Sequence, residues 1–480
     1  MADYARLTRS GPPPKVGIVH LGPGAFFRAF NAVYTHEAME TDKGDWGILA
    51  VSLRSPTARD QLNPQGGTYT AVTLGGQGMV PKQIESIAGV LVAPEDPKAV
   101  VDAMADPAVK IVSLTITEKG YCRSPSTGRL DETHPDIAHD LAGLEAPVSA
   151  IGFIVAALAA RRKAGVAPFT VLSCDNLPSN GALVRDIVQA FARLFDADLA
   201  RWIEEHVVFP STMVDRITPA TTPDDRKVLS ELTGYQDEAC VFHEPFRQWV
   251  IEDRFPQGKP AWGKVGAQMV TSVHAHEVMK LRCLNGAHSM LAYLGYLAGY
   301  DTIAETVADP HFAALCQNVW RDEIIPTVPQ PDGEDLTAYC ATLMERFKDP
   351  AIRHRTWQIA TDGSQKLPQR ILGTFADNLA QGRSPKGLAL AVAGWMRYVG
   401  GVDENGGDID VRDPLAQTLR KTSESAQSAT GKVQALLDVE DVFAPRFAQD
   451  AQVQRLLSDA YDDLVNLGAK AAVQRAASNP

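Results

Sequence analysis

The stretch KVGIVHLGPGAFFR, residues 15–28, decides the fold of this 480-residue chain. Its first half is an apolar run of the kind that forms a strand buried in a sheet. Gly22 and Gly24 follow in a turn, and a helical pattern continues to about Met39. A strand, a glycine turn and a helix form the setting in which a backbone meets the pyrophosphate of a dinucleotide. The stretch therefore predicts an α/β nucleotide-binding domain, although Phe27 holds the place of the third glycine of the usual fingerprint.

Strand and helix patterns alternate over the first part of the chain. Further apolar runs lie at residues 46–53, 68–74, 83–92, 109–116 and 169–174. This alternation indicates a mostly parallel, doubly wound sheet. From about residue 275 onward helical periodicity dominates, so we expect a Rossmann-like domain over residues 1–270 and a mostly α-helical domain over residues 271–480.

The end of the second strand bears on the choice of cofactor. A dinucleotide without a 2′-phosphate usually meets an Asp or Glu there. In this chain Arg54 takes that place, and Asp60 is the first acid beyond it. Arg54 would favour a 2′-phosphate unless it points to solvent, so the residues themselves leave NAD and NADP both open.

The segment KLRCLNGAH, residues 280–288, opens a long apolar helix pattern. At 3.6 residues per turn, Lys280, Asn285 and His288 fall within an arc of roughly 140°. An amine in apolar surroundings loses proton affinity, which would make Lys280 a general base near neutral pH and Asn285 a neutral hydrogen-bond donor. The competing interpretation is a solvated lysine beside Arg282 and a histidine with a purely structural hydrogen bond.

Two other features have both a functional and a structural interpretation. Asn176 follows a buried strand, where it would contact a ligand or simply begin the next helix. Five basic residues lie close together in an otherwise acidic chain, where they would hold a carboxylate or form a surface patch. They are Arg353, His354, Arg355, Lys366 and Arg370.

Composition and motifs exclude several classes of function. The formal net charge of −12 argues against general binding to nucleic acid or anionic membrane. The six scattered cysteines, the absence of a signal-peptide core and the shortness of the apolar runs predict a cytoplasmic protein with free thiols. His274 and His276 invite a metal-ligand interpretation, but no cluster of further ligands accompanies them, so we expect no metal. Without a heptad stripe, we expect a monomer or a weak oligomer.

Taken together, these segments resemble the polyol-specific long-chain dehydrogenase/reductase family, or mannitol dehydrogenase family, over nearly the whole chain. The matching segments are residues 18–29, 113–121, 173–181, 213–217, 244–249 and 279–288. The resemblance implies an NAD-dependent, zinc-independent hydride transfer on a small sugar acid or polyol. One departure is Phe30, which stands where the family typically has a histidine.

The resemblance also implies roles for individual residues. Lys280 would be the general acid/base, Asn176 and Asn285 would polarise the carbonyl, and His288 would orient the substrate. Asp215 would line the pocket, with Lys366 contributed by the second domain. Gly22, Gly24 and Phe26 would border the pyrophosphate, and Glu277 would carry protons to solvent.

Segments 353–358, 363–370 and 394–398 look most like the fructuronate reductase, or mannonate oxidoreductase, branch of this family. A hexonate carboxylate needs cationic partners such as Arg355 and Lys366, whereas mannitol needs only hydrogen bonds. We therefore favour D-mannonate and D-fructuronate, with mannitol 2-dehydrogenase or a pentitol dehydrogenase as the alternative. A lyase that uses Lys280 as a Schiff-base nucleophile and a non-catalytic nucleotide sensor are the alternatives outside this chemistry.

Overall fold

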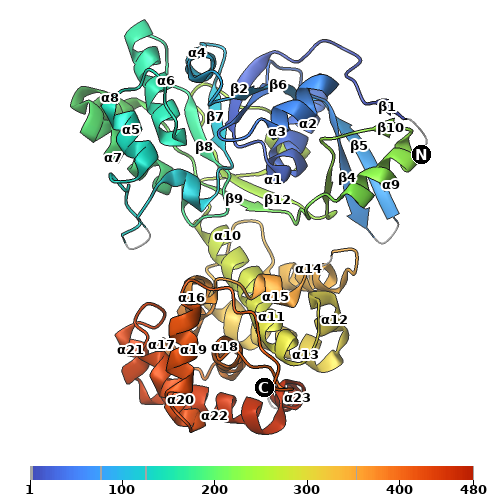
Figure 1. The fold of residues 1–480 in the computed structure, drawn as a ribbon, viewed down its shortest axis with the longest axis vertical. Coiled ribbons are helices and arrows are strands. Elements are labelled where there is room, and N and C mark those ends of the chain that lie inside the picture. The colour runs from blue at the N-terminus through green and yellow to red at the C-terminus, as the bar shows by residue number, and fades with distance from the viewer. Residues whose placement is uncertain (1–3, 76–77, 125–126, 353, 479–480) are drawn as a thin grey trace. The chain divides into compact units, whose positions relative to one another are not determined.

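The computed structural model describes residues 4–75, 78–124, 127–352 and 354–478. The chain forms two compact units, Met1–His274 and Ala275–Pro480. Figure 1 shows strands and helices mixed in the first unit and helices dominating the second. The expected combination of a Rossmann-like α/β domain and a mostly helical domain is confirmed.

A five-stranded sheet forms the centre of the first unit. Its strands are β2 (Val16–Leu21), β3 (Gly47–Ser52), β6 (Ile87–Val92), β7 (Ile111–Leu114) and β8 (Thr170–Ser173). They lie in the order β6-β3-β2-β7-β8, and every neighbouring pair is parallel. The chain therefore moves from β2 to one side of the sheet through β3 and β6, and then to the other side through β7 and β8.

Alternate residues of β2 face opposite sides of the sheet and supply two separate cores. Val19 and Leu21 belong to a core that also takes in α4 (Pro97–Ala105), α6 (Ala150–Ala164) and α7 (Asn180–Phe195). Ile18 belongs to the core on the other face, together with α1 (Ala25–Ala29) and α2 (Asn31–Thr41). This period of two is what a strand covered on both faces requires, and Figure 1 shows the two helix layers.

Three smaller sheets accompany the parallel one. Two antiparallel strands, β4 (Tyr69–Gly75) and β5 (Gly78–Ile84), form a sheet with β11 (Val241–His243). The other strands are β9 (Thr212–Asp215), β12 (Gln248–Glu252) and β13 (Gln268–Val270) in one sheet, and β1 (Ala5–Arg6) and β10 (Tyr235–Gln236) in another.

The prediction of one strand over residues 83–92 was wrong. The chain leaves β5 after Ile84 and enters the parallel sheet at Ile87. Between them the Ser86 hydroxyl donates to the Ala32 carbonyl at 2.7 Å, which fixes the crossing from one sheet to the other.

The helix predicted to run from the glycine turn to about Met39 is interrupted. It forms α1 and α2 with a break at Phe30, whose backbone angles of φ −129° and ψ −83° are not helical. The Phe30 side chain is fully buried and packs against Trp249, with ring centroids 5.7 Å apart. The break therefore places a large aromatic ring in the core. The other helices of this unit are α3 (Thr57–Leu62), α5 (Pro135–Ala142), α8 (Ala197–His206) and α9 (Pro223–Thr233).

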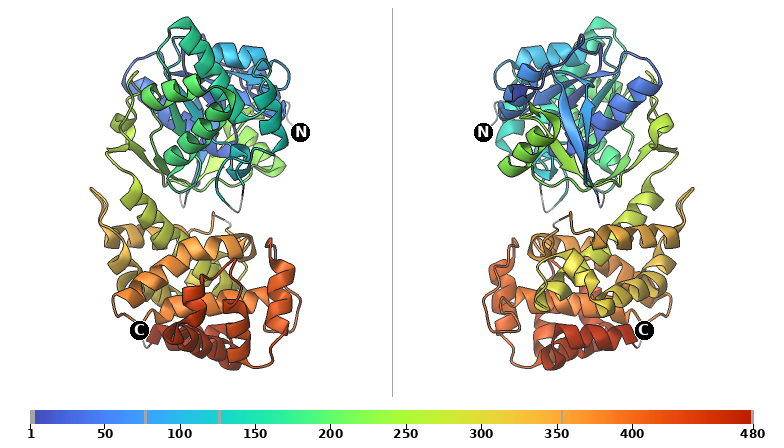
Figure 2. Two further views of the ribbon diagram at one scale, coloured as in Figure 1. Left: turned by 90° about the vertical axis from the view of Figure 1, so that its left-hand side faces the viewer. Right: turned by 90° about the vertical axis from the view of Figure 1, so that its right-hand side faces the viewer.

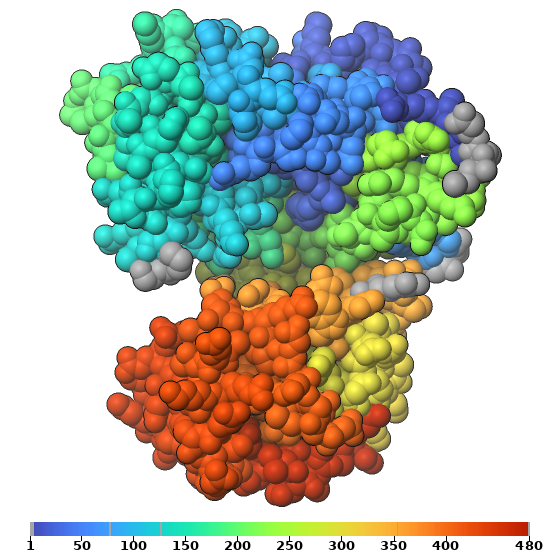
Figure 3. Space-filling view, in the orientation of Figure 1, coloured from blue at the N-terminus to red at the C-terminus, as the bar shows by residue number. Residues whose placement is uncertain are grey.

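The second unit is built from helices. They are α10 (His274–Met279), α11 (Ala287–Leu297), α12 (Ile303–Ala308), α13 (Pro310–Val319), α14 (Leu336–Lys348), α15 (Thr356–Ile359), α16 (Gly363–Leu367), α17 (Gly373–Ala380), α18 (Lys386–Val399), α19 (Ala416–Glu424), α20 (Ala429–Leu437), α21 (Pro445–Gln449), α22 (Ala451–Leu467) and α23 (Ala469–Ser478). Helices α11 and α18 are buried along almost their whole length, as their apolar sequences require. Figure 2 shows the surrounding helices from two sides, and Figure 3 shows the C-terminal segments, in orange and red, over much of the visible face of this unit.

All six cysteines are buried free thiols, as predicted. Within the described ranges, none of the helices combines the length and the apolar character needed to cross a bilayer.

Candidate functional site

Two glycines shape the turn after β2. Gly22 has a φ of 93°, a conformation that residues with a side chain rarely adopt. A Cβ added there would also collide with the carbonyl oxygen of Thr115. A Cβ added at Gly24 would project into open space, with the Gly22 carbonyl oxygen at 4.0 Å as its nearest neighbour. Glycine is therefore required at position 22 by the backbone, and at position 24 it leaves room for a ligand.

His20 holds this turn in place through a chain of hydrogen bonds. Its Nδ1 lies 2.8 Å from Ser113 Oγ and its Nε2 lies 2.9 Å from Thr115 Oγ1. The Thr115 hydroxyl donates its own hydrogen to the Gly22 carbonyl at 2.7 Å. The Thr115 oxygen therefore accepts a hydrogen bond from His20, whose Nε2 is the protonated ring nitrogen. Burial lowers the pKa of His20 to about 3, and the ring stacks on Phe27 with centroids 3.6 Å apart. A neutral imidazole thus makes the glycine turn rigid.

A cavity of about 660 Å³ lies at the carboxyl ends of β2, β3 and β7. Its lining includes Gly22, Gly24 and Arg54. This is the edge of a parallel sheet at which dinucleotides bind, and the volume suits a small-molecule ligand. The open space at Gly24 means that the residues present fit a nicotinamide dinucleotide. Phe26, expected beside the pyrophosphate, is half-buried and stacks on Phe30 with ring centroids 5.0 Å apart.

Acidic residues lie at the ends of two strands of the first unit, β8 and β9. Asp175, directly after β8, accepts from the backbone N–H of Ile116 at 3.0 Å and of Thr117 at 2.9 Å. Burial raises the pKa of Asp175. This carboxylate ties the end of β8 to the chain that leaves β7, and it presents the next residue, Asn176, at the surface of the unit. Asp215 is the last residue of β9 and is buried.

In the second unit, Lys280 is buried, with only 7% of its surface exposed. Residues Lys280–Gly286 form a π-helical stretch, η4, between α10 and α11. The prediction of a regular α-helix was therefore wrong here. In a π-helix the hydrogen bonds join residues five apart, so Asn285 lies about one turn beyond Lys280 on the same face. Widened turns of this kind are frequent at functional sites.

Neighbouring elements support the π-helical stretch. The indole N–H of Trp320 donates to the Cys283 carbonyl at 2.8 Å. Arg282 forms an ion pair with Asp377 at 2.6 Å and donates to the Thr327 carbonyl at 2.8 Å. Arg282, the second cation of the segment, is therefore held by a carboxylate.

His288 lies two residues beyond η4 in a buried aromatic environment. Its ring stacks on Phe347 with centroids 5.3 Å apart, and its Nε2 lies 3.2 Å from Nδ1 of His354. Burial lowers the pKa of His354 to about 4 and the pKa of His288 well below its ordinary value. Both rings are neutral at pH 7, so the N–H of one ring donates a hydrogen bond to the bare nitrogen of the other. This hydrogen bond fixes the tautomer of both rings.

A close approach of two backbones brings part of the basic stretch to this helix. A Cβ added at Gly286 would lie 2.8 Å from the carbonyl oxygen of Arg370, in the π-helical stretch η7 (Pro368–Leu372). Arg370 donates to Ser289 Oγ at 3.1 Å, and Lys366 donates to the Thr361 carbonyl at 2.6 Å. Burial lowers the pKa of both cations.

Arg355 differs from these two cations in its exposure. Arg355 is exposed at the start of α15, and Arg353 lies outside the described residues. Arg370 and His354 were predicted only as members of the basic stretch, although the spacing of four between Lys366 and Arg370 places both of these cations on one helix face.

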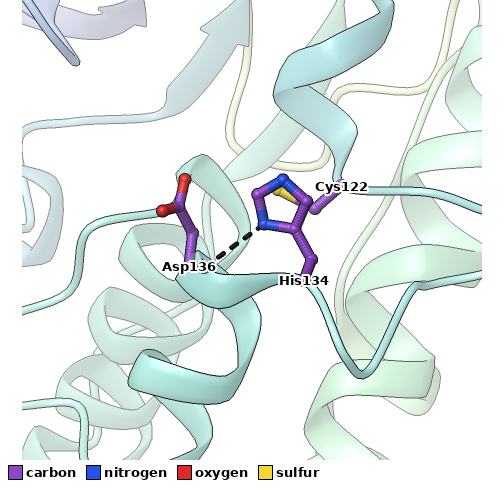
Figure 4. Close-up of side chains that lie close together, drawn as sticks. All are labelled: Cys122, His134 and Asp136. Carbon is purple, nitrogen blue, oxygen red and sulfur yellow. Dashed lines mark hydrogen bonds between the residues drawn. The ribbon is translucent and has the colours of Figure 1, made fainter.

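The possible metal ligands fall into two groups. His274 and His276 lie in α10, where positions two apart point to nearly opposite sides, so their rings do not converge. The side chains of Cys122, His134 and Asp136 have ligand atoms within 4.8 Å of one another. Figure 4 shows these three, with His134 Nδ1 accepting a hydrogen bond from the Asp136 backbone N–H at 3.2 Å.

Comparison with known proteins gives matches along nearly the whole chain. Residues 16–264 match the mannitol dehydrogenase Rossmann domain, and residues 272–465 match the mannitol dehydrogenase C-terminal domain. A D-mannonate oxidoreductase of Escherichia coli (strain K12) is 48% identical over 460 residues, which are 95% of this chain and 94% of the relative. A mannitol 2-dehydrogenase of Cereibacter sphaeroides is 41% identical, with 96% of each chain covered.

A solved structure also matches the whole chain. The Pseudomonas fluorescens mannitol 2-dehydrogenase, in a ternary complex with NAD and D-mannitol, has a TM-score of 0.85 and 40% identity. The match covers 100% of this chain and 98% of the other.

These matches and the dinucleotide cavity define the molecule as an NAD-dependent dehydrogenase that acts on a secondary CH–OH group. Within that class, the chain belongs to the mannitol dehydrogenase family.

Proposed function

We propose that this enzyme interconverts D-mannonate and D-fructuronate with NAD. The observation that carries the proposal is the pair of partly buried cations, Lys366 and Arg370, beside the helix that holds His288. A carboxylate is the natural partner of such cations. The similarity to a D-mannonate oxidoreductase supports the same substrate.

Each site residue has a proposed role in this reaction. Buried Lys280 takes the hydroxyl proton during oxidation and returns it during reduction. Asn285 and Asn176 donate hydrogen bonds to the reacting oxygen. Neutral His288, steadied by His354, orients the substrate. When bound, a nicotinamide ring supplies the hydride acceptor or donor.

The remaining assignments concern binding. Asp215 lines the substrate pocket, and Lys366 and Arg355 are the predicted partners of the substrate carboxylate. Gly22 and Gly24, with Phe26 close by, hold the dinucleotide pyrophosphate, and Arg54 lies near its ribose. Residues 1–270 form the nucleotide-binding domain and residues 271–480 the substrate domain. We further infer a cytoplasmic monomer or weak oligomer, which accords with six free thiols.

D-Mannitol oxidation is the second candidate. It is favoured by the 40% identity to a mannitol 2-dehydrogenase whose structure contains D-mannitol. A neutral polyol would need hydrogen bonds alone and would leave Lys366 and Arg370 without a substrate carboxylate as partner.

The first experiment compares initial rates of NAD⁺ reduction with D-mannonate and with D-mannitol, each repeated with NADP⁺. We expect a clear preference for D-mannonate. Lys366→Gln should raise KM for D-mannonate about tenfold or more and change KM for D-mannitol little, because it removes one charge-assisted contact. Lys421→Gln, at an exposed position in α19, is the control. A preference for D-mannitol would refute the carboxylate assignment.

The role of Lys280 has a separate test. Lys280→Ala should lower kcat by a factor on the order of 10²–10⁴, since that is the usual contribution of general acid–base catalysis. Binding of NADH, measured by fluorescence, should be unchanged. Near-normal turnover by the variant would end this assignment. Trapping of a substrate adduct with borohydride would instead favour Schiff-base chemistry.

A further inference from the structure

An ion pair crosses from the end of β3 to α5 beside the dinucleotide cavity. Arg54 Nη2 lies 2.7 Å from Asp136 Oδ2. The Asp136 side chain is 19% exposed and that of Arg54 is 75% exposed. Both residues line the cavity that Gly22 and Gly24 also line. The pair joins positions 82 residues apart in the sequence.

The position of this pair bears on the cofactor's 2′ group. In an open α/β sheet of this type, the end of the second strand meets the adenosine ribose, where an acid binds the 2′-hydroxyl and an arginine accommodates a 2′-phosphate. Here Arg54 lies two residues beyond the end of β3, and by itself it favours the phosphate. An acid is nevertheless present at the same wall of the cavity, because helix α5 contributes Asp136 there.

We propose that Asp136 is the residue that makes this enzyme select a dinucleotide without a 2′-phosphate. This inference rests on the proposed function, because it assumes that the cavity binds a nicotinamide dinucleotide. Asp136 neutralises Arg54, and its carboxylate accepts a hydrogen bond from a hydroxyl of the adenosine ribose. A 2′-phosphate would meet this carboxylate and would be repelled.

The surroundings of Asp136 hold it in place. It lies in the first turn of α5, where a negative charge is favoured. The buried carboxylate of Asp140 ties the same helix to the start of α6, because it accepts from the backbone N–H of Val148 and of Ser149, both at 2.9 Å. Val148 and Ser149 also line the cavity. Helix α5, which carries Asp136, is therefore anchored to a segment that lines the cavity.

A metal site made of Cys122, His134 and Asp136 is the competing interpretation (Figure 4). Such donors suit Zn²⁺. However, His134 Nδ1 already accepts a backbone N–H, which leaves the ring proton on Nε2. Burial also raises the pKa of the Cys122 thiol to about 11. A bound cation would have to displace the proton from His134 Nε2 and the Arg54 guanidinium from Asp136. The ion pair between Arg54 and Asp136 therefore explains these contacts better than a metal site does.

The test is a fluorescence titration of the full-length protein with NADH and with NADPH. Asp136→Asn should shift the ratio of the two dissociation constants toward NADPH by about tenfold or more, since one charge beside a phosphate is removed. Arg54→Gln should weaken the binding of NADPH by a similar factor and leave the affinity for NADH nearly unchanged. Glu132→Gln, at an exposed acid just before α5, removes the same charge without touching Arg54 and should leave the ratio as it is.

Several outcomes would overturn the proposal. These are an unchanged ratio in Asp136→Asn, an equal shift in Glu132→Gln, and a ratio that depends on EDTA or added Zn²⁺. If Asp136→Asn fails to fold, as judged by its melting curve, Arg54→Gln decides the question alone, and unchanged NADPH affinity there overturns the proposal. Because the titration needs no substrate, inactivity toward D-mannonate would refute the proposed function without altering this result.

Discussion

Replacing Gly286 with alanine tests the close contact between η4 and η7. The added Cβ would lie 2.8 Å from the Arg370 carbonyl oxygen and 3.7 Å from that of Leu281. The first distance is about 0.5 Å shorter than an ordinary C···O contact near 3.3 Å. Because the obstacle is backbone, it has to shift rather than rotate away. Overpacking of this kind costs about 1–3 kcal/mol, against a gain of about 0.5–1 kcal/mol from removing a helical glycine.

The expected net effect is a free energy of unfolding lower by about 0.5–2 kcal/mol. For a unit of about 200 residues this corresponds to a melting temperature lower by roughly 1–8 °C, measurable by circular dichroism. The shift also moves Lys366 and Arg370 relative to Lys280 and His288, so kcat/KM should fall while NADH affinity stays unchanged.

Gly373→Ala is the matched control for this experiment. Its added Cβ would find Arg282 Nη2 at 3.9 Å and the Pro368 carbonyl oxygen at 4.0 Å, which are ordinary contacts. This variant should be as stable as the parent or slightly more stable. If the two alanine variants have the same melting temperature and the same kcat/KM, the backbone contact at Gly286 has no energetic importance and the reasoning fails.

Two further predictions concern buried groups. Burial raises the pKa of Glu323 to about 7, although its carboxylate accepts from the backbone N–H of Gly387 at 2.7 Å and of Leu388 at 2.8 Å. Since the folded pKa exceeds the ordinary value of 4.5, the contribution of this carboxyl to stability is fully present below pH 4.5 and falls by about 3 kcal/mol as pH rises through 7. Denaturant titrations should show this pH dependence in the parent protein, and the same dependence in Glu323→Gln would contradict it. The six buried thiols should react with a thiol reagent only after unfolding, and rapid labelling of the native enzyme would contradict their burial.

The sequence was sufficient for the parallel sheet and the glycine turn, because both depend on local patterns. The run before Gly22 could only be a buried strand, and the turn needed glycine at that position. The prediction merged the end of β5 with β6 into one strand, because the break between them depends on a contact that is not local. The break at Ser86 depends on a hydrogen bond to Ala32, which is distant in sequence.

The spacing of Lys280, Asn285 and His288 was enough to predict that they share one helical segment and one face of it. No sequence pattern indicated that residues Lys280–Gly286 are π-helical. The basic stretch looked uniform in the sequence, and only tertiary contacts separate partly buried Arg370 from exposed Arg355. The ion pair between Asp136 and Arg54 was not predicted, because the two residues lie far apart along the chain.

The π-helical stretch at Lys280–Gly286 has a consequence for how this segment tolerates a change in length. A π turn is an α-helix that has taken in one extra residue, and α10 and α11 keep their buried faces on either side of it. Removing one residue between Lys280 and Asn285 would therefore return the segment to a regular α-helix without rotating α11 out of the core. Such a shortened protein would fold, yet it would have lost the wide turn that sets an amine and an amide above one another.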